Sequence, residues 1–175
     1  MDRELSVKCP KCKAKILIPA AKQPDQSFQD PFGERRNALI CVGGDDLKKM
    51  AVAVIKQIGL NIEVVTTTKA ALNKMEYHIY HLVIMDDAFD GGKGVSGLME
   101  RLNSIDMSLR RRICLIRISN KFHTSDDMAS LHSSVNTILH SNDIIQLESF
   151  LSRALMEHKN FYTVYNDSLK LAGKA

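Results

Sequence analysis

The segment Leu82-Val83-Ile84-Met85-Asp86-Asp87 places four consecutive apolar residues directly before two carboxylates. An uninterrupted apolar run of this length, closed by polar residues, is typical of a strand that is buried on both faces. It predicts a strand over residues 82–85 with Asp86 at its C-terminal end. A glycine-rich loop at residues 91–94 follows, and the next apolar residues predict a helix over residues 95–102.

The same alternation continues outward in both directions. Further apolar runs predict strands, and stretches with apolar residues three and four positions apart predict amphipathic helices. In chain order, the expected elements are strand 38–42, helix 47–58, strand 61–66, helix 68–77, strand 82–85, helix 95–102, strand 113–118, a short helix within 124–132, strand 135–139 and a helix over about 144–155. This pattern predicts an α/β fold, a doubly wound (βα)₅ parallel sheet with helices on both faces.

The domain pattern predicts four parts. Residues 1–19 contain a cysteine knuckle, and residues 20–37 form a linker with two Pro, three Gln and no apolar periodicity. Residues 38–157 form the (βα)₅ domain. Residues 158–175 form a C-terminal extension, in which the spacing of Phe161, Tyr165 and Leu171 predicts a helix that packs on the parent domain or binds a partner.

Composition excludes several classes of protein. The 175 residues carry a net charge of +4, too small an excess to indicate nucleic-acid binding by itself. Aromatic residues make up 6% and Trp is absent, which argues against a base-stacking surface. No apolar run approaches the roughly 20 residues of a membrane span, and the first residues lack a secretory pattern. We therefore expect a cytoplasmic protein, without a membrane role, whose four Cys are thiols or metal ligands.

A (βα)₅ chain with Asp at the C-terminal end of its third strand resembles the receiver domain of bacterial response regulators. The segment His81-Leu82-Val83-Ile84-Met85-Asp86 is similar to the Asp-Leu-Val-Leu-Leu-Asp segment of that family. The resemblance covers about residues 38–157 and implies a flavodoxin-like signalling domain. It also implies that Asp86 is the candidate phospho-acceptor.

In that family an acidic pair after the first strand holds Mg²⁺ together with the acceptor Asp, and the metal neutralises charge on the phosphoryl group. Here the corresponding positions hold Gly43-Gly44, or Val42-Gly43 by strict spacing. Asp45 and Asp46 are the nearest acidic candidates. Asp45 has a simpler use, because its carboxylate can cap the following helix.

The family also places a Ser or Thr after the fourth strand and a Lys after the fifth strand, and both contact the phosphoryl oxygens. Ser119 is the candidate for the hydroxyl position after a small register shift, and His140 stands at the Lys position. The resemblance therefore implies a degenerate receiver. We expect phosphorylation at Asp86 to be weak or absent, and Mg²⁺ is not an expected cofactor.

Cys9-Pro10-Lys11-Cys12 has the spacing of one zinc knuckle, and the segment 7–19 resembles the first half of short zinc ribbons. No second CxxC follows. Cys9 and Cys12 are candidate Zn²⁺ ligands if two chains share one ion; otherwise the motif is a remnant or a reactive dithiol. Cys41 and Cys114 fall in predicted strands and are expected to behave as buried apolar residues.

The favoured function is an atypical, stand-alone receiver that is not an enzyme and acts by binding. Its partner would be a histidine kinase or another signalling protein, bound through the fourth helix, fifth strand and fifth helix, at residues 124–132, 135–139 and 144–155. A homodimer is a further expectation. The alternative is a nucleic-acid-binding regulator that uses the knuckle and Arg110-Arg111-Arg112. An enzyme is disfavoured because no nucleophile elbow or dinucleotide fingerprint is present.

Overall fold

The computed structural model describes residues 5–8, 15–18 and 36–173, and the chain forms two units, Met1–Glu34 and Arg35–Ala175. In the first unit, β1 (Leu5–Lys8) pairs antiparallel with β2 (Lys15–Ile18). Cys9 and Cys12 lie between these strands in the sequence but outside the described residues. The zinc knuckle therefore stays a prediction.

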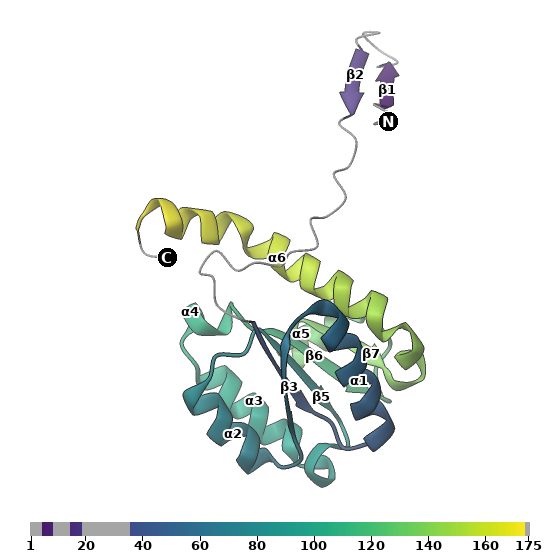
Figure 1. The fold of residues 1–175 in the computed structure, drawn as a ribbon, viewed down its shortest axis with the longest axis vertical. Helices are drawn as coiled ribbons and strands as arrows, with labels where there is room; N and C mark the ends of the chain where they lie inside the picture. The colour runs from purple at the N-terminus through teal and green to yellow at the C-terminus, as the bar shows by residue number, and fades with distance from the viewer. Residues whose placement is uncertain (1–4, 9–14, 19–35, 174–175) are drawn as a thin grey trace. The chain divides into compact units, whose positions relative to one another are not determined.

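The second unit alternates strands with helices, as Figure 1 shows. Its elements, in chain order, are β3 (Asn37–Cys41), α1 (Asp45–Ile58), β4 (Asn61–Val65), α2 (Thr68–Tyr77), β5 (Leu82–Asp86), the 3₁₀ helix η1 (Phe89–Gly92), α3 (Gly94–Ser104), α4 (Met107–Arg110), β6 (Cys114–Ser119), α5 (Asp127–His132), β7 (Thr137–His140), the 3₁₀ helix η2 (Ser141–Gln146) and α6 (Leu147–Leu171). The predicted (βα)₅ alternation is confirmed.

The five strands of this unit form one parallel sheet in the order β4-β3-β5-β6-β7. β5 is the central strand, flanked by β3 and β6. Ala38 pairs with Leu82 and Asp86 pairs with Ile118. The residues that end β5 therefore lie between the loop that leaves β3 and the end of β6, which is where a doubly wound sheet places its ligands.

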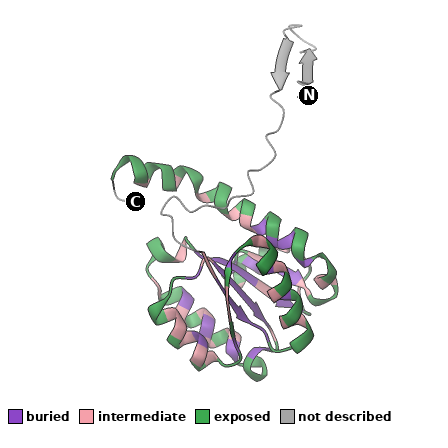
Figure 2. Ribbon diagram, in the orientation of Figure 1, coloured by how far each residue is buried: buried purple, intermediate pink, exposed green. Residues whose placement is uncertain are grey.

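The core has two layers, one on each face of the sheet. Alternate strand residues such as Ile40 and Ile84 pack with α1 and α6, whereas Leu39 and Val83 pack with α2, α3 and α5. Strands β3, β5 and β6 are buried almost throughout, whereas the edge strand β4 is mostly exposed or half-buried, as Figure 2 shows. Burial on both faces explains why these three strands are continuous apolar runs rather than alternating patterns.

Two local predictions are wrong, one at the start of a helix and one at the start of a strand. Asp45 does not cap α1, because Gly44 is the N-cap residue and makes no side-chain bond, while Asp45 is the first helical residue and pairs with Lys48. The last strand begins at Thr137 rather than at residue 135, because the N–H of Val135 donates to the carbonyl of Ser130 and continues the turn that ends α5.

The expected C-terminal extension is not a separate element. It is the second half of α6, which runs for 25 residues without a break. Its first half buries Leu147, Phe150, Leu151 and Ala154 against the sheet. None of the described helices is both long and apolar enough to cross a membrane.

Candidate functional site

Asp86 ends the central strand and lies almost fully out of solvent, with 6% of its surface exposed. Its Oδ1 accepts a hydrogen bond of 3.0 Å from the N–H of Gly43. Burial raises the pKa of Asp86 above its ordinary value, although the amides of Gly43 and Phe89 act in the opposite direction. The carboxylate is therefore held by the loop that follows β3 and is screened from water.

The Gly43 position has no room for a side chain. A Cβ atom built there would lie 2.7 Å from the carbonyl oxygen of Ala88 and 2.9 Å from its carbonyl carbon. Real Cβ atoms essentially never come this close to backbone. The backbone of the loop after β5 thus occupies the space in which an acidic side chain from position 43 would have to lie.

Asp45 and Asp46 lie in the first turn of α1, on its solvent side. Their side chains are 85% and 100% exposed. Asp45 accepts from Lys48 at 2.9 Å, and Asp46 lies 3.9 Å from Lys49. Pairing with Lys48 lowers the pKa of Asp45. Both carboxylates are thus exposed to solvent beside lysines of their own helix.

Ser119 and His140 end the two strands beyond β5, and both side chains bind groups other than Asp86. The Ser119 hydroxyl donates to Oδ2 of Asp87 at 2.6 Å and accepts from the N–H of Lys121 at 3.1 Å. Nδ1 of His140 accepts from the N–H of Asn142 at 3.1 Å and so caps η2. Neither side chain makes a hydrogen bond to Asp86 among the described contacts, so the phosphoryl-contact role of both residues stays a prediction.

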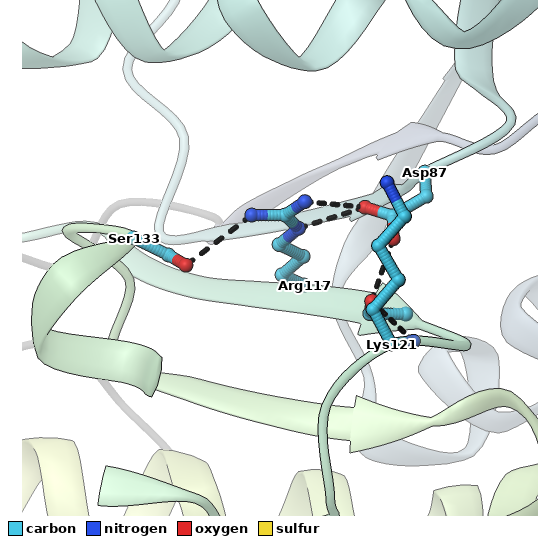
Figure 3. A network of polar contacts seen from close by, with 5 residues as sticks. Asp87, Arg117, Lys121 and Ser133 are labelled. Carbon is cyan, nitrogen blue, oxygen red and sulfur yellow. Dashed lines mark hydrogen bonds and ion pairs between the residues drawn. The ribbon is translucent and has the colours of Figure 1, made fainter. Parts of the chain in front are cut away.

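Asp87, rather than Asp86, is the centre of the polar network at this edge of the sheet, as Figure 3 shows. Its Oδ1 accepts from Nε of Arg117 at 2.8 Å and lies 2.7 Å from Nη2 of the same guanidinium. Nη1 of Arg117 donates to the hydroxyl of Ser133 at 3.2 Å. The network joins the end of β5, strand β6 and the C-terminal end of α5.

Sequence reasoning missed this network, although one signal was present. Arg117 lies inside the apolar run of β6, and a cation in such a strand is costly to bury unless an anion pairs with it. Both side chains of the ion pair with Asp87 are only 18% exposed. A charge-assisted contact at that depth, with both nitrogens on one carboxylate oxygen, fixes geometry more firmly than an exposed pair does.

The loop after β5 is fixed on its far side as well. Asp90 has a φ of +50° and accepts from both the N–H and the hydroxyl of Thr68, at 2.9 and 2.6 Å. The two bonds lower the pKa of Asp90. Phe89 is fully buried between these anchors. The loop thus closes over Asp86, held at Gly43 on one side and at the start of α2 on the other.

The basic run before β6 takes part in intramolecular contacts. Arg110 donates to the carbonyls of Ile113 and Ser134, at 3.1 and 3.0 Å. Arg111 lies over the ring of Tyr165, 4.6 Å from its centroid. These contacts give both arginines a structural use and weaken the nucleic-acid alternative.

The strand cysteines behave as predicted. Cys41 and Cys114 are buried, and burial raises the pKa of each thiol to about 12. Such thiols are poor nucleophiles and poor metal ligands. In residues 36–173 no group of three or more His, Cys, Asp or Glu side chains is arranged to hold a metal ion.

No family model matches this sequence, and no curated protein matches it. Solved structures do resemble it. A CheY-like response regulator receiver domain from Methylobacillus flagellatus is 18% identical, with a TM-score of 0.52, over 69% of this chain and 99% of that one. A CheY-like receiver domain protein from Methanospirillum hungatei JF-1 is 16% identical, with a TM-score of 0.54, and the match covers 71% of this chain and 98% of that one. A sensor protein from Polaromonas sp. JS666 is 21% identical, with a TM-score of 0.54, and the match covers 71% of this chain and 99% of that one.

These likenesses establish the class of fold. The Arg35–Ala175 unit has the fold of the response regulator receiver domain, as the resemblance of its third strand implied. Asp86 lies at the C-terminal end of the central strand of that fold.

Proposed function

We propose that this chain is a signalling module of the receiver fold that acts by binding a protein partner, without Mg²⁺-dependent phosphorylation at Asp86. The contact between Gly43 and Ala88 carries the proposal. Mg²⁺ requires several oxygen ligands in a near-octahedral arrangement. Asp86 is buried with its Oδ1 bound to an amide, and position 43 cannot supply a second carboxylate. The residues present therefore do not fit a Mg²⁺ site.

The groups that would hold a phosphoryl group are also engaged elsewhere. Phosphoryl transfer depends almost entirely on positioned charges and hydrogen-bond donors. The Ser119 hydroxyl is bound to Asp87, and the imidazole of His140 is bound to the start of η2. A phosphoryl group on Asp86 would gain no lysine at the His140 position, so its charge would be poorly compensated.

The proposed binding surface combines α5, β7, η2 and the start of α6. Met128, Leu131 and Ile145 are 63%, 71% and 87% exposed. The Thr124 hydroxyl donates to Asp143, so the segment before α5 is tied to η2. Exposed apolar side chains on elements held together in this way are suited to a protein partner, such as a histidine kinase or another signalling protein.

Phosphorylation is tested by incubating the full chain with Mg²⁺ and acetyl phosphate and measuring the intact mass. A receiver domain that accepts phosphate serves as the positive control. We expect no stoichiometric addition to this chain. Addition of one phosphoryl group that disappears in Asp86→Asn contradicts the proposal, and Asp45→Ala would then show whether Asp45 supplies the metal site.

The binding surface is tested by titrating purified signalling proteins of the same cell, histidine kinases first, against the wild-type chain and two variants. Leu131→Glu places a charge on the proposed surface and should weaken binding at least tenfold. Tyr77→Ser changes a residue of α2 that is 81% exposed and should leave binding unchanged. Equal effects of the two variants would place the interface elsewhere.

A further inference from the structure

The surface proposed for protein binding, formed by α5, β7, η2 and the start of α6, is held together at the start of α5. The Thr124 hydroxyl donates to Asp143 of η2 and accepts from the N–H of His140 at the end of β7. The hydroxyl of the next residue, Ser125, accepts from Nη2 of Arg153 on α6 at 3.0 Å. The exposed residues of α5 and those around the start of α6 therefore belong to one surface.

This surface is acidic, although the chain as a whole is basic. Residues 121–148 carry four acidic side chains, a single Lys and no Arg, whereas the full chain has a net charge of +4. Asp126 accepts from the N–H of Ala129, and Asp143 accepts from the hydroxyl of Thr124. These donors are neutral, so they do not cancel the charge of the two carboxylates. The surface therefore has an excess of negative charge.

Arg153, on α6, does not cancel this excess. Its guanidinium donates to the Ser125 hydroxyl and also lies 3.9 Å from the carboxylate of Glu157, four residues further along the helix. Arg153 and Glu157 together add no net charge. The excess of negative charge on the surface therefore remains when the neighbouring part of α6 is included.

The other two carboxylates lie next to exposed apolar side chains. Asp127 and Leu131 are four residues apart on α5, so they lie on one side of that helix. Glu148 follows Ile145 by three residues, one helical turn further along the chain. Both carboxylates are exposed, and the described contacts of residues 36–173 include no hydrogen bond or ion pair to either of them. Each carboxylate is thus available to a cation that arrives together with an apolar contact.

We propose that the partner segment bound by this surface is a basic amphipathic helix. Met128 and Leu131 are exposed and three residues apart, so they form a ridge on which the apolar side of a helix packs. Lys or Arg side chains beside that apolar side would meet Asp127 and Glu148. An acidic segment would bring like charges together. This inference rests on the proposed function, because it names the chemistry of the partner at the same surface.

The partner class is tested with two fluorescent peptides of about 18 residues, or five helical turns, with Leu at helical spacing and either Lys or Glu elsewhere. Anisotropy is measured against the full chain. The Lys peptide should bind with a Kd below about 100 μM, and the Glu peptide at least tenfold more weakly. The chain is basic as a whole, so its net charge cannot explain a preference for Lys. No binding of the Lys peptide up to about 1 mM overturns the inference.

The site of binding is tested with matched charge reversals. Glu148→Lys should weaken the Lys peptide about three- to tenfold and strengthen the Glu peptide. Glu76→Lys is the control, since Glu76 is exposed on α2, which contacts β3 and β4 at the other edge of the sheet. Asp127→Asn is a second, milder variant and should weaken the Lys peptide about two- to fivefold. Equal effects of Glu148→Lys and Glu76→Lys overturn the inference.

A neutral variant, Leu131→Gln, separates failure of this inference from failure of the proposed function. If both peptides bind equally and both are weakened by Leu131→Gln, the surface binds protein without selecting a basic partner, which overturns this inference alone. A dimer of the full chain that is lost in Leu131→Gln makes a second copy the occupant and also overturns it. Failure of the proposed function appears in the earlier titration, as equal effects of Leu131→Glu and Tyr77→Ser.

Discussion

Gly43 and Ala88 come from different strand ends and meet at the carboxyl end of the sheet. Two glycines after an apolar run predict a turn, and the resemblance to receiver domains marks them as replacing an acidic pair, but neither signal explains why position 43 must be glycine. The reason for glycine became visible only in the structure, because it depends on the path of a loop that starts 43 residues later with Asp86. Spacing along the chain carries no information about such a contact.

Gly43→Ala should lower the free energy of unfolding by about 1–3 kcal/mol, because the added methyl group must displace the backbone of Ala88. The measurement is a urea titration followed by circular dichroism. Gly44→Ser is the matched control: a Cβ there has 3.9 Å of clearance, and Ser is a favourable N-cap residue, so stability should hold or rise. Equal losses in the two variants would contradict the steric argument.

The pair of Asp87 and Arg117 should couple strongly, because both side chains are 18% exposed and are joined by a hydrogen bond and an ion-pair contact. Asp87→Ala leaves a largely buried guanidinium without its carboxylate and should cost about 2–4 kcal/mol of unfolding free energy. A double-mutant cycle with Arg117→Ala should give a coupling energy above about 1 kcal/mol. Strictly additive losses would show that the network in Figure 3 contributes little to stability.

At the scale of elements, the central strands and the long helices were predictable from the sequence. Strands that are buried on both faces are continuous apolar runs, and helices that bury one face have apolar residues three and four positions apart. Helix α2 has the predicted bounds, 68–77. The short elements η1 and α4 were not predicted. Asp90 and Gly91 of η1 take left-handed conformations with φ of +50° and +67°, which follow from the bonds to Thr68 and not from any periodicity.

Leu151→Ala should lower the free energy of unfolding by about 2–5 kcal/mol, because Leu151 is fully buried where α6 packs on the sheet. Ile145→Ala is the control, since Ile145 is 87% exposed on the neighbouring η2 and should change stability by less than about 0.5 kcal/mol. Chemical denaturation of both variants measures the difference. A loss below about 0.5 kcal/mol for Leu151→Ala would mean that this part of α6 does not pack as described.

We expect His158 to make the stability of the fold around α6 sensitive to acid. Burial lowers the pKa of His158 to about 4, and the nearby Arg110 and Arg36 act in the same direction. In the unfolded chain the imidazole takes up a proton near pH 6.5. The stability that depends on neutral His158 is therefore complete above pH 6.5 and is lost as the pH falls toward 4, by up to about 1.4 kcal/mol per pH unit.

The measurement is the free energy of unfolding from pH 7.5 to pH 4 for the wild-type chain and for His158→Gln. The carboxylates titrate in both proteins, so the difference between the two curves isolates His158. We expect the wild-type curve to fall more steeply below pH 6.5. Parallel curves would show that His158 is protonated as easily in the fold as in the unfolded chain.

At the scale of the whole molecule, the prediction concerns Zn²⁺ binding by Cys9 and Cys12 in the N-terminal unit. Two thiolates fill half of a tetrahedral site, so a tight site needs a second chain. We predict one Zn²⁺ per two chains by elemental analysis, and loss of the metal in Cys9→Ser. The (βα)₅ unit should keep its circular dichroism spectrum without the metal, because it has its own core. Metal-free wild-type protein would leave the knuckle as a remnant or a dithiol.

The close approach of Gly43 and Ala88 also has an evolutionary consequence. Any substitution at position 43 must first displace the loop after β5, and that loop is anchored at Thr68 as well. A lineage that carries this loop cannot gain a carboxylate at position 43 by one tolerated substitution, because the intermediate is destabilised before it acquires any benefit. A metal site at Asp86 that uses a carboxylate at position 43 would therefore require two regions, residue 43 and the loop after β5, to change together.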